Sequence, residues 1–167
     1  LMEELPLTAI KGNASEIKAL ALGSSTTQGV DANAADVVTE ENLAAQVAFA
    51  KSYAAELGCV LAITGPIDLV TDGTRCFAIR NGRPEMEKIT GTGCQIAGIL
   101  TAYLVANPDA QLEAAAAAVA LMGVAGEIAW DALQPGEGNA TYRNRIIDAI
   151  CTMDAETLEA KANYEVF

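Results

Sequence analysis

The stretch that decides the fold is Cys59-Val-Leu-Ala-Ile-Thr64, which is followed at once by Gly65-Pro66. It contains no charged residue, which is typical of a strand buried on both faces of a parallel sheet. The glycine and proline behind it predict a turn. A buried parallel strand needs helices packed on the sheet, so this stretch predicts an α/β domain.

The residues before this strand predict a strand, a helix, a loop and a second helix. Pro6–Ile10 is apolar and predicts a buried strand, which Gly12-Asn13 would end in a turn. The apolar spacing within Ala14–Leu22 predicts a helix. Polar and small residues fill Gly23–Glu41, which we interpret as a surface loop or flap. The second helix is predicted from Thr39 to about Gly58, with an apolar face at Leu43, Val47, Ala50 and Ala54.

The residues after the buried strand predict a hairpin and then a run of helices. Ile67–Thr71 and Arg75–Arg80 read as two antiparallel strands joined across Asp72-Gly73. Helices are predicted over Gly93–Ala106, Ala110–Ala132, Asn139–Thr152 and Ala155–Ala162. These elements amount to about four strands, fewer than a doubly wound sheet ordinarily has. We therefore expect further strands to come from residues outside this chain.

Composition excludes several classes of function. The chain of 167 residues has 22 acidic and 10 basic residues, so its field repels nucleic acid and anionic lipid. The longest apolar run, Ala114–Val124, is shorter than a bilayer span. The four cysteines have no CxxC spacing, which favours a reduced, cytoplasmic protein. The absence of histidine excludes Ser-His and Cys-His triads and His-ligated zinc within this chain.

The strongest chemical signal is Lys88-Ile-Thr-Gly91-Thr92-Gly93-Cys94, which directly precedes an apolar helical run. Glycines at a helix start let the backbone approach a ligand, and the N–H groups there attract anions. The same pattern would also fit a loop that merely starts a helix. Cys94 falls in the first helical turn, where the helix dipole favours a thiolate that could act as a base. The alternative is a small buried hydrophobic residue.

A second signal, Lys11-Gly12-Asn13-Ala-Ser-Glu16, follows the first strand. Ligands of α/β sheets bind outside the carboxyl ends of the strands, so Lys11 could contact a phosphate there. Asn13 and Glu16 could hold a hydrated Mg²⁺, although an N-cap and its capping-box partner explain them as well.

A third signal, Ile63-Thr64-Gly65, lies at the end of the next strand, where a hydroxyl and a glycine could meet a nucleotide. A simple turn explains it equally well. Two acids follow this segment, Asp68 and Asp72, and we interpret them as turn and surface residues.

Taken in order, Lys-Gly-Asn-x-x-Glu, Ala-Ile-Thr-Gly, Asn81-Gly82 and Lys-x-Thr-Gly-Thr-Gly-Cys resemble the hydroxyethylthiazole kinase family over nearly the whole chain. The resemblance implies a ribokinase-like, three-layer α/β/α sandwich with a mostly parallel sheet and an antiparallel edge hairpin. In the wider superfamily an aspartate follows the Gly-x-Gly, so Cys94 is the residue that distinguishes the thiazole kinases.

The resemblance also implies a reaction, the ATP-dependent phosphorylation of the hydroxyl of 4-methyl-5-(2-hydroxyethyl)thiazole in thiamine biosynthesis and salvage. By position it implies that Lys11 and Thr64 contact ATP, that Gly91 contacts the substrate, and that Cys94 is catalytic. Thr92 and Gly93 would complete the anion hole. Asn13 and Glu16 match the metal-associated Asn-x-x-Glu, with Mg²⁺ as cofactor.

Two departures from the family pattern bear on these expectations. Family members usually have arginine where this chain has Lys11, which keeps the charge but loses the bidentate geometry. Family chains also begin about a hundred residues earlier, in a part that supplies sheet strands and most of the substrate pocket. We therefore expect residues 1–167 to be a partial domain, the ATP-binding and catalytic half, in a homotrimer or with a chain that carries the N-terminal part.

Three other functions remain open at this point. One is a non-catalytic nucleotide-binding or assembly module. Another is the ATP- or ADP-dependent dehydratase of hydrated NAD(P)H, which shares the fold but has aspartate in place of Cys94. The third is an acyl or thioester enzyme that uses Cys94 with the same anion hole, although it would lack a histidine base.

Overall fold

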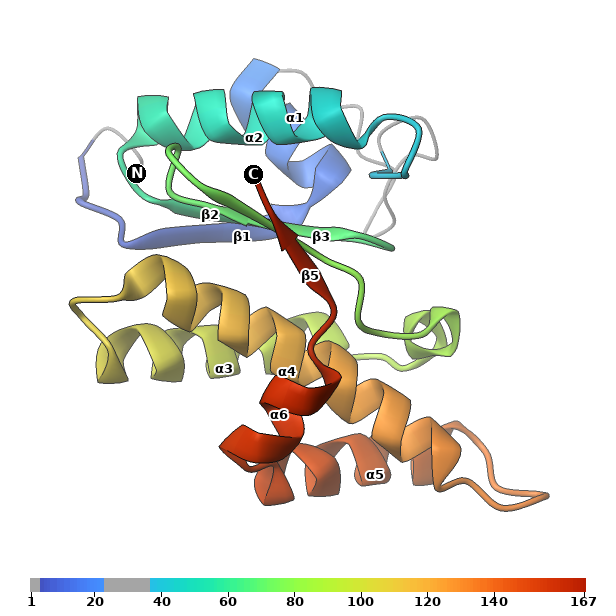
Figure 1. Cartoon of the computed structure of the whole chain (residues 1–167). Coiled ribbons are helices and arrows are strands. Elements are labelled where there is room, and N and C mark those ends of the chain that lie inside the picture. The colour runs from blue at the N-terminus through green and yellow to red at the C-terminus, as the bar shows by residue number, and fades with distance from the viewer. Residues whose placement is uncertain (1–3, 23–36) are drawn as a thin grey trace. The chain divides into compact units, whose positions relative to one another are not determined.

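The computed structural model describes residues 4–22 and 37–167, which form two compact units (Figure 1). Unit 1 contains the described residues up to Ala78 together with Glu165–Phe167, and unit 2 is Ile79–Tyr164. The chain passes from one unit to the other within two strands, β4 and β5.

The sheet has the strand order β1-β2-β3-β4-β5. β1 and β2 pair in parallel, and β2 and β3 pair antiparallel. Cys76 in β4 and Phe167 just after β5 exchange two backbone hydrogen bonds, at 3.0 and 2.9 Å, as antiparallel neighbours do. The sheet is therefore mixed, with an antiparallel edge, as the sequence predicts. The strand bounds are Ala9–Asn13 for β1, Val60–Thr64 for β2, Asp68–Thr71 for β3, Cys76–Ile79 for β4 and Tyr164–Val166 for β5.

Two helices of unit 1, α1 (Ala14–Leu22) and α2 (Leu43–Leu57), lie over the same face of the sheet (Figure 1). The predicted apolar face of α2 is buried, and Gly58 ends the helix with a left-handed φ of 66°. Together the helices and the sheet form one apolar core, which includes Ile17, Leu43, Val47, Ala50, Ala54, Leu61, Ile63 and Leu69. Burial of these side chains is what holds the carboxyl ends of β1 and β2 in place.

Unit 2 is helical. A 3₁₀ helix, η1 (Pro84–Lys88), precedes α3 (Thr92–Ala106), and the long helix α4 (Gln111–Asp131) packs against α3, α5 (Asn139–Thr152) and α6 (Ala155–Lys161). By length and composition α4 could cross a membrane, but 78 % of its most apolar window is buried inside the protein. It is therefore the core helix of this unit.

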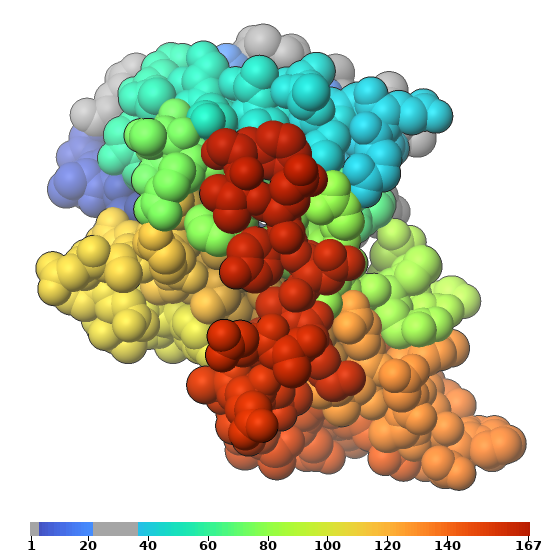
Figure 2. All heavy atoms as spheres, in the orientation of Figure 1, coloured from blue at the N-terminus to red at the C-terminus, as the bar shows by residue number. Residues whose placement is uncertain are grey.

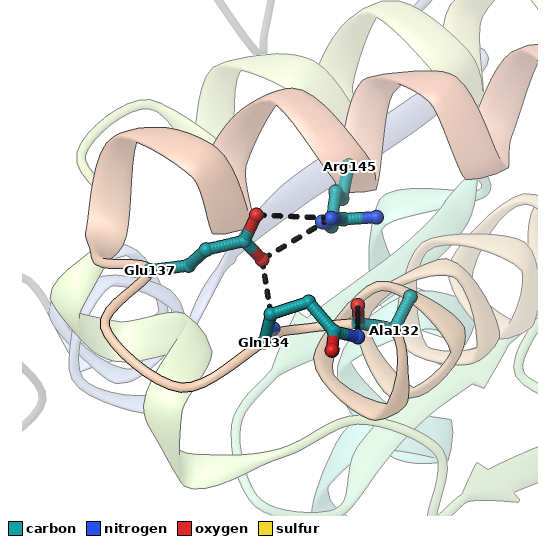
Figure 3. A network of polar contacts seen from close by, with 4 residues as sticks. All are labelled: Ala132, Gln134, Glu137 and Arg145. Carbon is teal, nitrogen blue, oxygen red and sulfur yellow. Dashed lines mark hydrogen bonds and ion pairs between the residues drawn. The ribbon is translucent and has the colours of Figure 1, made fainter.

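Aromatic and polar contacts fix α5 against α4. The Tyr142 hydroxyl donates to the Gly126 carbonyl at 3.0 Å, and its ring meets Trp130 edge to face. In the connection between the helices, Glu137 accepts from two partners (Figure 3). One Arg145 nitrogen lies 3.1 Å from each of its carboxylate oxygens, and the Gln134 N–H donates at 2.8 Å. These hydrogen bonds close the loop Gln134-Pro-Gly-Glu-Gly138 between α4 and α5.

The structure confirms most predicted elements and corrects the first strand and the start of the second helix, which begins at Leu43 and not at Thr39. The helix at Ala14–Leu22 and the helix at Asn139–Thr152 have the predicted bounds. The first strand is Ala9–Asn13, so the prediction of a strand at Pro6–Ile10 with a turn at Gly12-Asn13 is wrong. The strand continues because its partner β2 supplies hydrogen bonds as far as Asn13. Residues 23–36 of the predicted loop lie outside the described part of the chain.

The strand β5 and the helix η1 have no counterpart in the sequence predictions. β5 is three residues long and its side chains are exposed, so it is shorter than the run of about four to eight alternating residues that predicts a strand. Figure 2 shows the C-terminal residues, in dark red, at the surface, where the exposed fractions of Tyr164 and Val166 are 55 % and 49 %. Pairing with β4, not local propensity, makes this segment a strand.

Candidate active site

In unit 1 the predicted residues meet at the carboxyl ends of β1 and β2. In the parallel register Lys11 lies opposite Ala62, and Asn13 lies opposite Thr64. The Thr64 hydroxyl donates to the Gly12 carbonyl across the two strands at 3.4 Å. Because α/β sheets bind ligands at this end of their strands, the register places Lys11, Asn13 and Thr64 where a nucleotide site is expected.

Strand alternation puts Lys11 and Thr64 on one face of the sheet. Directly paired residues point to the same face, and so do residues two apart in one strand. Leu61 and Ile63 point to the opposite face, where they join the core beneath α1 and α2. Lys11 and Thr64 therefore point away from these two helices.

Asn13 and Glu16 form the capping box that the sequence allowed as an alternative. The Glu16 N–H donates to Asn13 Oδ1 at 2.9 Å, and the Asn13 N–H donates to Glu16 Oε2 at 2.7 Å. This reciprocal pair satisfies two backbone donors at the start of α1. The box also holds an amide oxygen and an exposed carboxylate beside each other at the strand end.

Asp68 also belongs to this strand end, although we predicted it only as a turn or surface acid. Its Oδ1 accepts the Gly65 N–H at 2.8 Å, which closes the turn between β2 and β3, and its side chain is half-buried. Burial raises the pKa of the carboxyl to about 7, against the lowering effects of the Gly65 N–H and the nearby charge of Lys11. A half-buried acid beside a cation thus lies at the candidate site.

Asp72 has the predicted turn role. Its Oδ1 accepts the N–H groups of Thr74 and Arg75, each at 2.8 Å. These hydrogen bonds and the charge of Arg75 lower the pKa of Asp72 below its ordinary value, although partial burial acts in the opposite direction. The carboxylate stabilises the turn from β3 to β4.

In unit 2 the glycine-rich segment begins α3. Gly91 is the N-cap with a φ of 98°, a left-handed conformation that favours glycine. Its carbonyl accepts the N–H groups of Cys94 and Gln95, at 3.1 and 3.0 Å. The Thr92 hydroxyl donates to the Ile89 carbonyl at 3.3 Å. The predicted helix start is thus confirmed, while an anion hole at Thr92 and Gly93 stays a prediction.

Cys94 lies in the first turn of α3 with an exposed thiol, so the alternative of a small buried hydrophobic residue is wrong. All four cysteines are free thiols, and Cys151 is the other exposed one. Cys59 and Cys76 are buried, and burial raises the pKa of both thiols, that of Cys76 to about 12. Thiolate chemistry at neutral pH is therefore disfavoured at the two buried positions.

Sequence reasoning missed Asp68 as a member of the candidate site. The signal for Asp68 was present, since an acid three residues after a glycine that follows a buried strand can close the turn onto that glycine. Among the described residues no group of three or more acidic or cysteine side chains is placed to hold a metal ion. The Mg²⁺ role of Asn13 and Glu16 therefore stays a prediction.

The chain matches known proteins over almost its whole length. A model of the hydroxyethylthiazole kinase family matches residues 1–156. A hydroxyethylthiazole kinase of Clostridium acetobutylicum is 45 % identical over 167 residues, which are 100 % of this chain and 61 % of that protein. One of Ruminiclostridium cellulolyticum is 36 % identical over 162 residues, or 97 % of this chain and 57 % of that protein. The chain thus spans about three fifths of the length of these relatives.

A solved structure supports the fold. The structure of a hydroxyethylthiazole kinase protein from Pyrococcus horikoshii OT3 superposes with a TM-score of 0.76 and 25 % identity, covering 96 % of this chain and 55 % of that one. The predicted α/β fold class is thereby confirmed. These names favour neither a dehydratase nor a non-catalytic module. With a family model matched over residues 1–156, the chain belongs to the hydroxyethylthiazole kinase family.

Proposed function

We propose that the protein to which this chain belongs transfers the γ-phosphoryl group of ATP to the hydroxyl of 4-methyl-5-(2-hydroxyethyl)thiazole, a step of thiamine biosynthesis and salvage. The observation that carries the proposal is the placement of Lys11 and Thr64 on one face of the sheet at the carboxyl ends of β1 and β2. The relatives named above, which are hydroxyethylthiazole kinases, support the substrate.

The proposed roles follow from what phosphoryl transfer requires. This reaction depends mainly on aligning the two substrates and on stabilising charge, so a few well-placed groups suffice. Lys11 and Thr64 contact ATP, and Gly91 contacts the thiazole alcohol. The N–H groups of Thr92 and Gly93 stabilise the transferred phosphoryl group. The exposed Cys94, as a thiolate, accepts the proton of the alcohol.

The chemistry of Asn13 and Glu16 fits a magnesium ion. Both present oxygen ligands, which Mg²⁺ prefers, and the capping box uses one lone pair of each of two oxygens. When bound, Mg²⁺ neutralises phosphate charge. The exposed carboxylate of Glu16 supplies the anionic ligand, directly or through water.

The proposal extends to the organisation of the protein. Residues 1–167 supply the ATP-binding and catalytic half of a kinase domain, and the sheet and the substrate pocket are completed by the part of the relatives that this chain does not span. The assembly is a cytoplasmic homotrimer or includes a chain with that part. Native and denaturing mass spectrometry of the purified protein tests this, since a single chain that stays monomeric would contradict it.

The activity is tested by incubating the purified protein with ATP, Mg²⁺ and the thiazole alcohol and by detecting the phosphate ester with ³¹P NMR. The matched control is 4-methyl-5-ethylthiazole, which lacks the hydroxyl and should give no ester. ADP formation that depends on the alcohol is the expected result. Binding of ATP without ester formation in the assembled protein would favour the non-catalytic module instead.

A further inference from the structure

Asp68 lies beside the two strand ends that carry the proposed nucleotide contacts. The antiparallel register pairs Ile63 with Leu69, which brings Asp68 opposite Thr64 at the start of β3. Its side chain therefore points to the same face as Thr64 and Lys11. The carboxylate accepts the Gly65 N–H at 2.8 Å, and the charge of Lys11 acts on it from β1.

We propose that Asp68 is a positioning residue of the nucleotide site, which holds the Thr64–Gly65 turn in the geometry that ATP requires. This inference rests on the proposed function, because it assigns the residue to the ATP contacts of that reaction. Asp68 acts through Gly65 and Thr64 and is not itself in contact with the reacting atoms.

Asp68 is linked directly to the end of β2 through the Gly65 N–H. Thr64 is the last residue of β2, and Gly65 follows it without an intervening residue, so a shift of the Gly65 amide moves Thr64. The Thr64 hydroxyl also donates a hydrogen bond to the Gly12 carbonyl, at 3.4 Å. Without Asp68 the turn would depend on that longer bond and on Pro66 for its position.

The role predicts different results for two substitutions of the same residue. Asp68→Ala removes the acceptor of the Gly65 N–H, so KM for ATP should rise about tenfold, the loss expected for one hydrogen bond to a charged group. The value of kcat should change less than about threefold, since the catalytic groups stay in place. Asp68→Asn keeps an acceptor oxygen and should restore KM to within about threefold of the wild type.

A binding measurement and a structural measurement test the inference together. ATP affinity is measured by isothermal titration calorimetry, and exchange of the Gly65 amide proton is followed by NMR. We expect Asp68→Ala to weaken ATP binding and to speed exchange at Gly65, and Asp68→Asn to do neither. A wild-type protein that binds no ATP would refute the proposed function and this inference with it. Unchanged ATP binding by a folded Asp68→Ala protein, or an Asn variant as weak as the Ala variant, would refute the inference alone.

Discussion

The carboxamide of Asn81 faces the carboxylate of Glu127, with Nδ2 3.2 Å from Oε1. The same carboxylate oxygen accepts the Gly82 N–H at 2.8 Å. The amide also donates to the Lys161 carbonyl at 3.0 Å and accepts the Asn163 N–H at 2.7 Å. Only 7 % of Asn81 is exposed, so this buried amide is satisfied by bonds to α4, to the last residue of α6 and to Asn163.

Gly123 is required by this arrangement. A Cβ at this position of α4 would lie 2.6 Å from the Asn81 carbonyl carbon and from its Cβ, where backbone atoms cannot give way. We expect Gly123→Ala to lower the free energy of unfolding by about 2 to 3 kcal/mol, measured by urea denaturation. Gly98→Ala in α3 is the matched control, because nothing lies within 4 Å of its Cβ. It should stabilise the protein by about 0.5 to 1 kcal/mol. Equal stability of the two variants would contradict the contact.

Cys94→Asp should keep or raise the kinase activity. A carboxylate at this place can accept the proton of the alcohol, and the start of α3 stabilises a negative charge. Cys94→Ala, which has no base, should lower kcat by about a hundredfold. Cys151→Ser, at the other exposed thiol, is the control and should leave kcat unchanged. A folded Cys94→Asp protein without activity would count against the role of Cys94 as the base.

Glu16→Gln should weaken the dependence on Mg²⁺ while leaving the capping box in place. Glutamine still offers an oxygen to the Asn13 N–H, but it lacks the charge that attracts the ion. We expect the Mg²⁺ concentration for half-maximal activity to rise about fivefold or more, with a smaller change in KM for the thiazole alcohol. Glu156→Gln, in the first turn of α6, is the control. An unchanged Mg²⁺ titration would leave Glu16 with its capping role only.

Asp68 should make stability depend on pH. Its pKa in the folded protein is about 7 against an ordinary value of 3.8, so between these values the folded state binds more protons than the unfolded state. Its contribution to stability should therefore fall as the pH rises from 4 to 7 and be lost above 7. Asp68→Asn removes this dependence, so the variant should gain stability relative to the wild type at pH 8 but not at pH 4.

Thermal denaturation at both pH values checks this prediction. Asp109→Asn, which removes a carboxylate from an exposed loop, serves as the control and should show no such difference between the two pH values. A wild type and an Asp68→Asn variant whose midpoints differ equally at pH 4 and pH 8 would contradict the pKa of Asp68.

The sequence predicts the helices and buried strands well, because the spacing of their apolar residues matches the face that each element packs on the core. The helix α1 begins where Asn13 and Glu16 indicate, since a capping box is a local interaction of neighbouring residues. β5 could not be predicted, because its pairing with β4 depends on residues far away in the chain. The turn that Asp68 closes onto Gly65 is local, whereas the face that Asp68 shares with Lys11 emerges only from the pairing of β1, β2 and β3.

The bonds of Asn81 also bear on the order in which the protein folds. Its partners lie 46, 80 and 82 positions further along the chain, so they leave the ribosome well after Asn81 itself. Until Asn163 has emerged, the amide of Asn81 must stay hydrated, because burying it without partners is costly. Packing of Asn81 and Gly82 against α4 is thus a late step of synthesis, and a nascent chain that stalls before Lys161 leaves this part of unit 2 open to proteases.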